Sequence, residues 1–395
     1  MTNDKKLETI NVGIVGHIDH GKTTLLYKLS GKWSSQHSEE LKRGITIKLG
    51  YADITIYKDK SGYNTKSGEA IKHVSFVDAP GHEMLMHTML SGAAIIDAAI
   101  LVVAANEGIK PQTREHLMAL QAKKVNNIIV VQNKIDLVGK EQASKSYMDI
   151  KELLKGKFAN APIIPVSAQQ EINIDKILEA IVNLPLPNRK IDGIPIFVVA
   201  RSFDINKPGT TPYKLHGTVL GGGLKQGKLN IGDEIEIKPG MAIKEANQLH
   251  YKTIKTKVKK LFTGNKEEKE LTPGGSQSIE TELDMAMGKA DNLAGSIVSL
   301  SEKLPELAYN LKVKYTLFPE IYMANGMIKI EPIKTPENLL LSANTAVTIG
   351  VVKKVGKNEV ELSLKVPIVP FKGDNVGVAR NIGGHWRLIG YGEIL

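Results

Sequence analysis

The chain has 395 residues and contains no cysteine, which excludes disulfide bonds and thiolate metal sites. A metal ion could therefore be held only by oxygen atoms or imidazole nitrogens. Long apolar runs are also missing, because the longest one, Ala93 to Ala105, is interrupted by Asp97. The first ten residues are polar and lack the apolar core of a signal peptide. We therefore expect no membrane association and a cytoplasmic location.

Length and composition indicate a folded protein of two or three domains. Hydrophobic residues make up 42% of the chain and charged residues 24%, which is ordinary for a globular protein. The formal net charge of +10 favours a polyanionic partner such as RNA. A role of this charge in solubility alone is the simpler alternative.

Up to about residue 185, short β-branched apolar runs alternate with segments of helical periodicity. The predicted strands are Asn11 to Val15, Val74 to Asp78, Ala99 to Ala104, Asn127 to Gln132 and Ile163 to Val166. The predicted helices are Lys22 to Ser30, Glu83 to Ile95, Pro111 to Ala122, Glu141 to Leu154 and Ile174 to Val182. This order predicts an α/β domain with a mostly parallel sheet flanked by helices, over residues 1–190.

The segment Leu184 to Ile194 combines prolines, a glycine and charges, and it is expected to be a linker. Beyond it, short alternating strands separated by turns predict two small β-barrel domains, over residues 191–303 and 304–395. One predicted strand, Thr253 to Lys260, places three lysines on one face. That face is either an RNA contact or, more simply, a solvated barrel surface.

A phosphate-binding loop follows the first predicted strand. Gly16 to Thr23 fits the pattern GxxxxGK[ST], and a helical segment comes directly after it. Backbone amides around Gly21 and the helix N-terminus suit phosphate oxygens. Lys22 can reach the β- and γ-phosphates, Thr23 offers a hydroxyl to Mg²⁺, and Thr24 adds a phosphate contact. The nucleotide contacts predicted in this loop are Asp19, His20, Gly21, Lys22, Thr23 and Thr24.

Two further motifs follow predicted strands, where α/β proteins bind ligands. In Asp78 to Gly81, the carboxylate can hold Mg²⁺ through water and the Gly81 amide can meet the γ-phosphate. In Asn133-Lys134-Ile135-Asp136, the aspartate can accept both N1–H and the 2-amino group of guanine, which adenine lacks. Ser167-Ala168-Gln169 stands where a backbone amide could contact guanine O6. Together the motifs predict GTP and GDP as ligands, with Mg²⁺.

These residues resemble translational GTPases, whose hallmarks correspond to Gly16 to Thr23, Arg43 to Thr46, Asp78 to His82 and Asn133 to Asp136. The resemblance implies that Thr46 closes over the γ-phosphate and Mg²⁺ and that His82 orients the attacking water. It also marks Gly44 as a backbone ligand for a second magnesium ion, for which Asp19, a carboxylate inside the phosphate-binding loop, is the other candidate ligand. It also implies a P-loop GTPase domain followed by two β-barrels. Because no arginine finger can be identified in the sequence, we expect slow hydrolysis in the absence of ribosomal partners.

Within that superfamily, His37 to Asp53, Arg201 to Gly209 and Pro111 to Leu120 are similar to the gamma-subunit family of archaeal and eukaryotic translation initiation factor 2. The similarity spans nearly the whole chain and ends in the segment from His385 to Gly392. It implies a factor that delivers methionyl initiator tRNA to the small ribosomal subunit, with α and β subunits as partners. The four-cysteine zinc knuckle common in that family is missing from Lys58 to Lys72, so no zinc is expected.

Three alternatives share parts of this pattern. An elongation-type carrier, such as one for selenocysteyl-tRNA, would have a similar domain order. A metabolic GTPase, such as the GTPase subunit of a sulfate-activating complex, reuses the same architecture. A protein with an inactive nucleotide site is disfavoured, because the residues expected to bind and hydrolyse GTP are all present.

Overall fold

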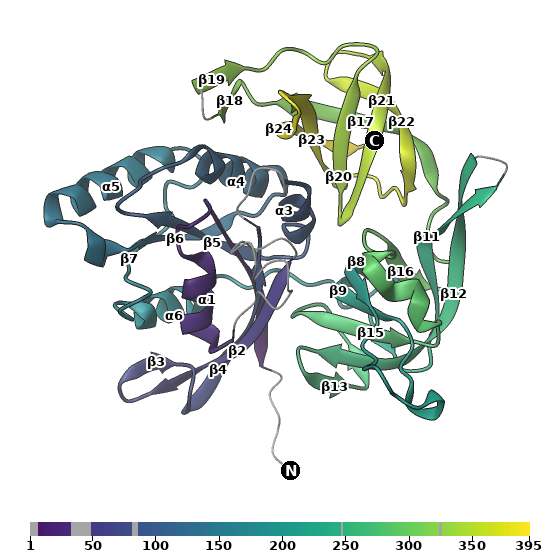
Figure 1. Cartoon of the computed structure of the whole chain (residues 1–395), viewed down its shortest axis with the longest axis horizontal. Coiled ribbons are helices and arrows are strands. Elements are labelled where there is room, and N and C mark those ends of the chain that lie inside the picture. Colours follow the sequence, from purple (N-terminus) through teal and green to yellow (C-terminus); the bar gives the residue numbers. More distant parts are fainter. Residues whose placement is uncertain (1–6, 33–48, 81–85, 246–247, 324–325) are drawn as a thin grey trace. The chain divides into compact units, whose positions relative to one another are not determined.

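The computed structural model describes residues 7–32, 49–80, 86–245, 248–323 and 326–395 (Figure 1). The chain folds as two compact units. The first comprises residues 1–187 and 319–329, and the second comprises residues 188–318 and 330–395. No helix in these described ranges is both long and apolar enough to cross a membrane.

The first unit contains a seven-stranded sheet in the order β3-β2-β4-β1-β5-β6-β7. Its strands are β1 (Glu8–Gly16), β2 (Gly50–Asp59), β3 (Gly62–Asn64), β4 (Glu69–Asp78), β5 (Ala98–Ala104), β6 (Asn127–Asn133) and β7 (Ile163–Pro165). The five strands from β4 to β7 in this order pair in parallel, while β2 pairs antiparallel with β4 and β3. The α/β class is therefore confirmed, with an antiparallel edge that the sequence pattern did not predict.

Within the described residues, five helices accompany this sheet: α1 (Lys22–Ser30), α3 (Met86–Gly92), α4 (Pro111–Ala122), α5 (Lys140–Leu153) and α6 (Ile174–Val182). Side chains of α1 and α6, such as Leu25 and Ile177, join the buried core formed by one face of the sheet. Figure 1 shows α3, α4 and α5 on the side of the sheet away from α1 and α6. Strand β5 is buried at every residue, which explains its uninterrupted apolar sequence.

The predicted helices Lys22 to Ser30, Pro111 to Ala122 and Ile174 to Val182 coincide with α1, α4 and α6. The predicted helix Glu83 to Ile95 was wrong at its C-terminal end, because α3 ends at Gly92. The amides of Ala94 and Ile95 instead bond to carbonyls three residues earlier, so the chain tightens into turns after the glycine. Residues 83–85 lie outside the described ranges.

The second unit contains two β-barrels, as predicted. The first barrel is built from β8 (Ile196–Phe203), β9 (Val219–Gln226), β11 (Glu234–Glu245), β12 (Gln248–Thr263), β13 (Lys266–Glu268), β15 (Gln277–Thr281) and β16 (Ile297–Leu300). Pairing of β11 with β12 closes its sheet, and β13 extends from β12 outside the ring. A short pair, β10 (Leu229–Asn230) with β14 (Glu270–Leu271), accompanies it.

The three lysines on β12 are each ion-paired. The Nζ atoms of Lys255, Lys257 and Lys259 lie 2.9, 3.5 and 3.4 Å from carboxylate oxygens of Glu302, Glu234 and Glu280, respectively. Because their charge is already balanced by acidic neighbours, the barrel-surface interpretation of this face is favoured over an RNA contact.

The second barrel is closed by six strands: β17 (Ala308–Leu317), β20 (Asn338–Ala343), β21 (Ala346–Val355), β22 (Glu359–Ile368), β23 (Asn375–Ile382) and β24 (His385–Ile394). A hairpin, β18 (Glu320–Met323) with β19 (Gly326–Lys329), belongs to the first unit. There the Arg114 guanidinium of α4 lies 4.4 Å from the centre of the Tyr322 ring, at cation–π distance.

The two barrels share a hydrophobic cluster. Ile196 and Ile297 from the first barrel pack with Leu304 and with Val369, which follows β22 of the second barrel. A polar contact also joins the two barrels, because the Lys225 ammonium donates to the side-chain carbonyl of Asn344. The two barrels therefore pack against each other instead of being joined only by a flexible linker.

Candidate nucleotide-binding site

The predicted site residues gather at the carboxyl ends of the parallel strands. β1 lies between β4 and β5 in the sheet, so the chain leaves β1 where the order of strands reverses direction. The register places Ile14 of β1 opposite Asp78 of β4, which brings the loop after β1 beside the end of β4. This is the position at which open α/β sheets bind ligands.

The loop between β1 and α1 requires glycine at both ends. Gly16 has φ 141°, and a Cβ atom there would lie 2.3 Å from the carbonyl oxygen of Val102. Gly21 has φ 90°, and its Cβ would lie 2.4 Å from Nδ2 of Asn133. Asp19 has φ 62° and is exposed at the tip of the loop. The glycines of the predicted pattern therefore serve both backbone conformation and close approach.

Lys22 is held under this loop. Its Nζ donates to the carbonyl of His17 at 2.8 Å, and the residue is only 7% exposed. Burial lowers the pKa of Lys22 to about 8, against the opposing effect of Asp78 and Asp19. The ammonium is therefore poorly solvated, and a phosphate group nearby would supply the counter-charge that burial withholds.

Thr23 and Asp78 come together as predicted for a magnesium site. The Thr23 hydroxyl donates to Oδ2 of Asp78 at 3.4 Å, and Asp78 is fully buried. A hydroxyl and a carboxylate are hard oxygen donors of the kind that Mg²⁺ prefers, so these residues fit that ion. Thr24 lies on the first turn of α1 and is partly buried.

Asn133 joins three parts of the site. Its Nδ2 donates to the carbonyl of His20 at 2.9 Å, and its Oδ1 accepts from the amide of Ala168 at 3.0 Å. The side chain is 2% exposed. Asn133 therefore fastens the loop after β1 to the loop after β7, a supporting role that its place in the sequence motif does not reveal.

The rest of the Asn133 to Asp136 motif lies at the edge of the site. Lys134 adopts a left-handed conformation with φ 60°, and its Nζ lies 3.3 Å from Oε1 of Glu107. The amide of Ile135 bonds to the carbonyl of Val166 at 3.3 Å. Asp136 is exposed, so its carboxylate is accessible to a ligand.

The segment 167–169 is positioned by the same network. Ser167 is buried, and its hydroxyl accepts from the amide of Gln170 at 3.2 Å. Because the Ala168 amide already donates to Asn133, the contact predicted with guanine O6 would have to share that amide or use another one. Gln169 is exposed. A guanine contact from this segment stays a prediction.

Four predicted residues, Gly44, Thr46, Gly81 and His82, lie outside the described residues. Their roles in closing over the γ-phosphate, holding magnesium and orienting water therefore stay predictions. The same holds for a second magnesium ion, because Asp19 is the one described member of that predicted pair.

Two buried histidines contact the backbone at and around the loop between β1 and α1. The Nδ1 atom of His116, on α4, accepts from the amide of Gly16 at 2.8 Å, and burial lowers the pKa of His116 to about 3. His20 is fully buried, its Nδ1 lies 3.2 Å from the carbonyl oxygen of Val102, and burial lowers its pKa to about 3. Both imidazoles are therefore neutral at physiological pH.

Sequence reasoning missed the role of His116. The only signal was a histidine placed on the apolar face of α4, one turn before the buried residues Ala119 and Leu120. At that position a histidine more often fills space in the core. Its contact with Gly16 appears only when α4 is packed against β1.

Comparison with known proteins agrees with this geometry. The model of the elongation factor Tu GTP binding domain matches residues 7–186, and that of the initiation factor eIF2 gamma C-terminal domain matches residues 309–394. The translation initiation factor 2 subunit gamma of Pyrococcus horikoshii is 48% identical over 398 residues, covering 98% of this chain and 97% of that protein. Its counterpart from Methanocaldococcus jannaschii is 48% identical over 402 residues, covering 98% of each.

Among solved structures, a bacterial selenocysteine-specific elongation factor, EF-Sec, superposes with a TM-score of 0.77 at 24% identity. The alignment covers 98% of this chain but 58% of that one, and at this identity it reports the fold alone. The relatives at 48% identity over nearly their full length carry the assignment. The chain therefore belongs to the family of translation initiation factor 2 gamma subunits and is a translational GTPase.

Proposed function

We propose that the chain carries methionyl initiator tRNA to the small ribosomal subunit in its GTP-bound state and releases it after hydrolysis. Its family membership and the grouping of Lys22, Thr23, Asp78 and Asn133 around one loop support this proposal. The α and β subunits of a heterotrimeric initiation factor would be its protein partners. The cytoplasm, where ribosomes initiate translation, would be its location.

The phosphate end of GTP would lie on the amides of the loop between β1 and α1. Lys22 would exchange its bond to the His17 carbonyl for the β- and γ-phosphates, since a desolvated ammonium gains most from a nearby anion. Thr23 and Asp78 would hold Mg²⁺, the latter through water. The ion would offset the negative charge of the phosphate oxygens.

The guanine end would be read by Asp136. Its exposed carboxylate can accept two donors from guanine, and a base without them leaves those oxygens unpaired. Asp136→Asn should therefore weaken GTP binding and favour xanthosine triphosphate, whose 2-position offers an acceptor to the new amide. Calorimetric titration with both nucleotides measures this exchange, and unchanged preference for GTP would refute the role of Asp136.

For hydrolysis, His82 would orient the attacking water and Thr46 would close over the γ-phosphate. No arginine that would complete the transition state is identified in the sequence, so turnover by the isolated subunit should be only on the order of 10⁻⁴ per second. Single-turnover hydrolysis should accelerate when ribosomal partners are added. Fast turnover by the isolated chain would contradict this assignment.

The carrier function is tested by filter binding of initiator and elongator methionyl-tRNA, each with GTP and with GDP, over a series of salt concentrations. Preference for initiator tRNA only with GTP supports the proposal. Equal binding of both tRNAs in both nucleotide states would indicate simple attraction to the +10 chain and would contradict it. Asp136→Asn is a matched control, because it should bind initiator tRNA with xanthosine triphosphate but not with GTP.

A further inference from the structure

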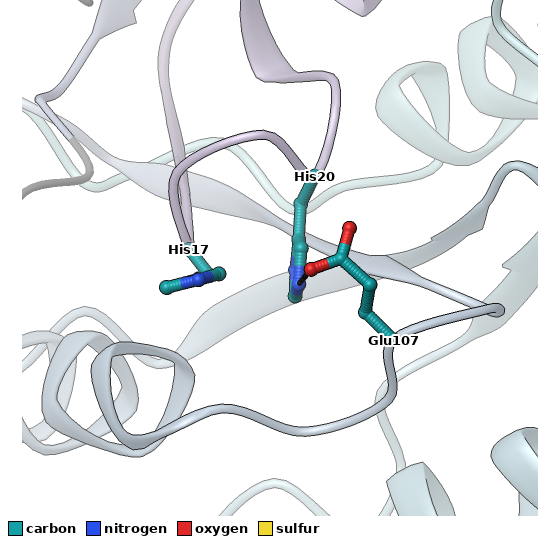
Figure 2. Close-up of side chains that lie close together, drawn as sticks. All are labelled: His17, His20 and Glu107. Carbon is teal, nitrogen blue, oxygen red and sulfur yellow. Dashed lines mark ion pairs between the residues drawn. The ribbon is translucent and has the colours of Figure 1, made fainter. Parts of the chain in front are cut away.

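Three side chains of types that can ligate metal ions lie close together at the loop between β1 and α1. His17 and His20 belong to that loop, and Glu107 belongs to the segment that follows β5 (Figure 2). One ligand atom from each residue lies within 4.8 Å of the other two. None of the nucleotide-binding roles described above uses these three side-chain atoms.

His20 is already oriented as a ligand. Its Nδ1 lies 3.2 Å from the carbonyl oxygen of Val102, so this nitrogen carries the proton and leaves a lone pair on Nε2. Nε2 is buried without a hydrogen-bond partner in the described structure and lies 3.9 Å from Oε2 of Glu107. Metal-bound histidines typically donate their other N–H to a carbonyl or carboxylate in this way.

His17 offers the second nitrogen. Its Nδ1 is buried and makes no contact of hydrogen-bond geometry among the described residues, although the Gln112 side chain lies beside the ring. The rings of His17 and His20 meet edge to face, with centroids 4.9 Å apart and planes at 71°. Two imidazole nitrogens without partners, in a buried place beside a carboxylate, each lose hydrogen bonds that water would supply. A bound cation would satisfy both nitrogens and would share the Glu107 carboxylate with its lysine neighbours.

We propose that His17, His20 and Glu107 bind one divalent transition-metal ion of the zinc and cobalt class. Two imidazoles and one carboxylate are the donors that such ions accept, with a fourth position left for water. Mg²⁺ prefers oxygen donors in octahedral geometry and should not compete. The expectation of no zinc, drawn from the lack of cysteine, concerned thiolate donors and does not extend to imidazoles.

Metal binding would draw together the three donor atoms, which lie within 4.8 Å of one another. Metal–ligand bonds of about 2.0–2.1 Å in a tetrahedron separate neighbouring donors by about 3.4 Å. His20 and Glu107 are at 3.9 Å and need side-chain adjustment alone. The side chain of Glu107 is 28% exposed, which gives the ion a path from solvent.

Two lysines set the strength of the site. The Nζ atoms of Lys134 and Lys110 lie 3.3 and 4.0 Å from carboxylate oxygens of Glu107 and compete with a cation for them. The ion should therefore bind more weakly than in a structural zinc site of four protein ligands. Lys134 belongs to the guanine-binding motif, and the backbone carbonyl of His17 accepts from the Lys22 ammonium. Because both lysines are expected to contact nucleotide, bound metal should also change the rate of GDP release.

The test uses the full chain without a histidine tag, free of nucleotide. Zn²⁺ is titrated by calorimetry, and Co²⁺ is added while its visible ligand-field bands are recorded. Glu107→Gln keeps the contact with Lys134 but removes a charged ligand, and His17→Gln removes one imidazole. His216→Gln is the control, because His216 pairs with the buried carboxylate of Glu280 in the first barrel. Circular dichroism verifies that each variant is folded.

We expect one Zn²⁺ per chain, tetrahedral Co²⁺ bands, at least tenfold weaker binding in Glu107→Gln and in His17→Gln, and unchanged binding in His216→Gln. Absence of Co²⁺ bands would overturn the proposal. So would equal Zn²⁺ affinity in the wild type and both folded site variants. If one variant does not fold, the other gives the same decision. Since no nucleotide or tRNA is present, either result leaves the carrier function to be decided separately.

Discussion

Replacing Asn133 by alanine removes two hydrogen bonds from the middle of the nucleotide site. The carbonyl of His20 loses its side-chain donor, and the buried amide of Ala168 loses its acceptor. The asparagine is 2% exposed, so water does not readily take its place. The alanine side chain cannot form these bonds, so it no longer connects the loop after β1 to the loop after β7.

The expected magnitude follows from these two bonds. A buried amide left without an acceptor costs about 1–3 kcal/mol, and loss of a neutral hydrogen bond to the carbonyl costs about 0.5–1.5 kcal/mol. Together they amount to about 1.5–4.5 kcal/mol. In the free protein the loops can relax and recover part of it, whereas bound nucleotide holds them in place. The cost should therefore be shared between lower stability and weaker GDP binding.

Urea unfolding of the nucleotide-free protein and calorimetric titration with GDP measure the two shares. Asn126→Ala is the matched control, since Asn126 is exposed just before β6 and Asn133 ends that strand. We expect the control to change the summed free energy by no more than about 0.5 kcal/mol. A similarly small sum for Asn133→Ala would refute the idea that this side chain holds the site together.

Three further predictions follow from the same loop. Gly21→Ala should cost about 1–2 kcal/mol for its left-handed backbone, and more from the 2.4 Å approach to Asn133, so GDP binding measured by calorimetry should be largely lost; unchanged affinity would contradict the close approach. Bound phosphate favours the charged form of Lys22, whose pKa is about 8 in the free protein. The affinity for GDP should therefore be complete below pH 8 and fall about tenfold per pH unit above it, which a pH series of GDP titrations checks. His116→Ala leaves the Gly16 amide without its acceptor and should lower the free energy of unfolding by about 1–3 kcal/mol in urea titrations; an unchanged midpoint would show that the bond contributes nothing.

The sequence predicted those parts of the fold that local pattern controls. Helix α4 begins at Pro111, which is favoured at a first helical position, and its bounds were predicted to the residue. β2 was missed although burial alternates along it up to Tyr57, because the segment GYADITIYKD contains polar and small residues that weaken the apolar signal. Its antiparallel place beside β4 depends on pairing between distant segments, which no local pattern encodes.

In the nucleotide site, too, the sequence predicted the residues that belong to local motifs but not the contacts between distant segments. Lys22, Thr23 and Asp78 lie in motifs whose chemistry is legible from residue type and order. The supporting contacts of Asn133 and His116 could not be predicted, because each joins segments far apart in the chain, with His116 reaching back 100 residues to Gly16. Such contacts exist only after the sheet and helices have packed.

The packing between the two barrels has a consequence for any partner that touches both. Because Ile196, Leu304 and Val369 share one apolar cluster, the two barrels cannot swivel independently without exposing it to water. A binding surface that spans both barrels is therefore preorganised, and a partner that covers it immobilises little that was previously free. Affinity at such a surface would depend on the contacts made rather than on the ordering of a hinge.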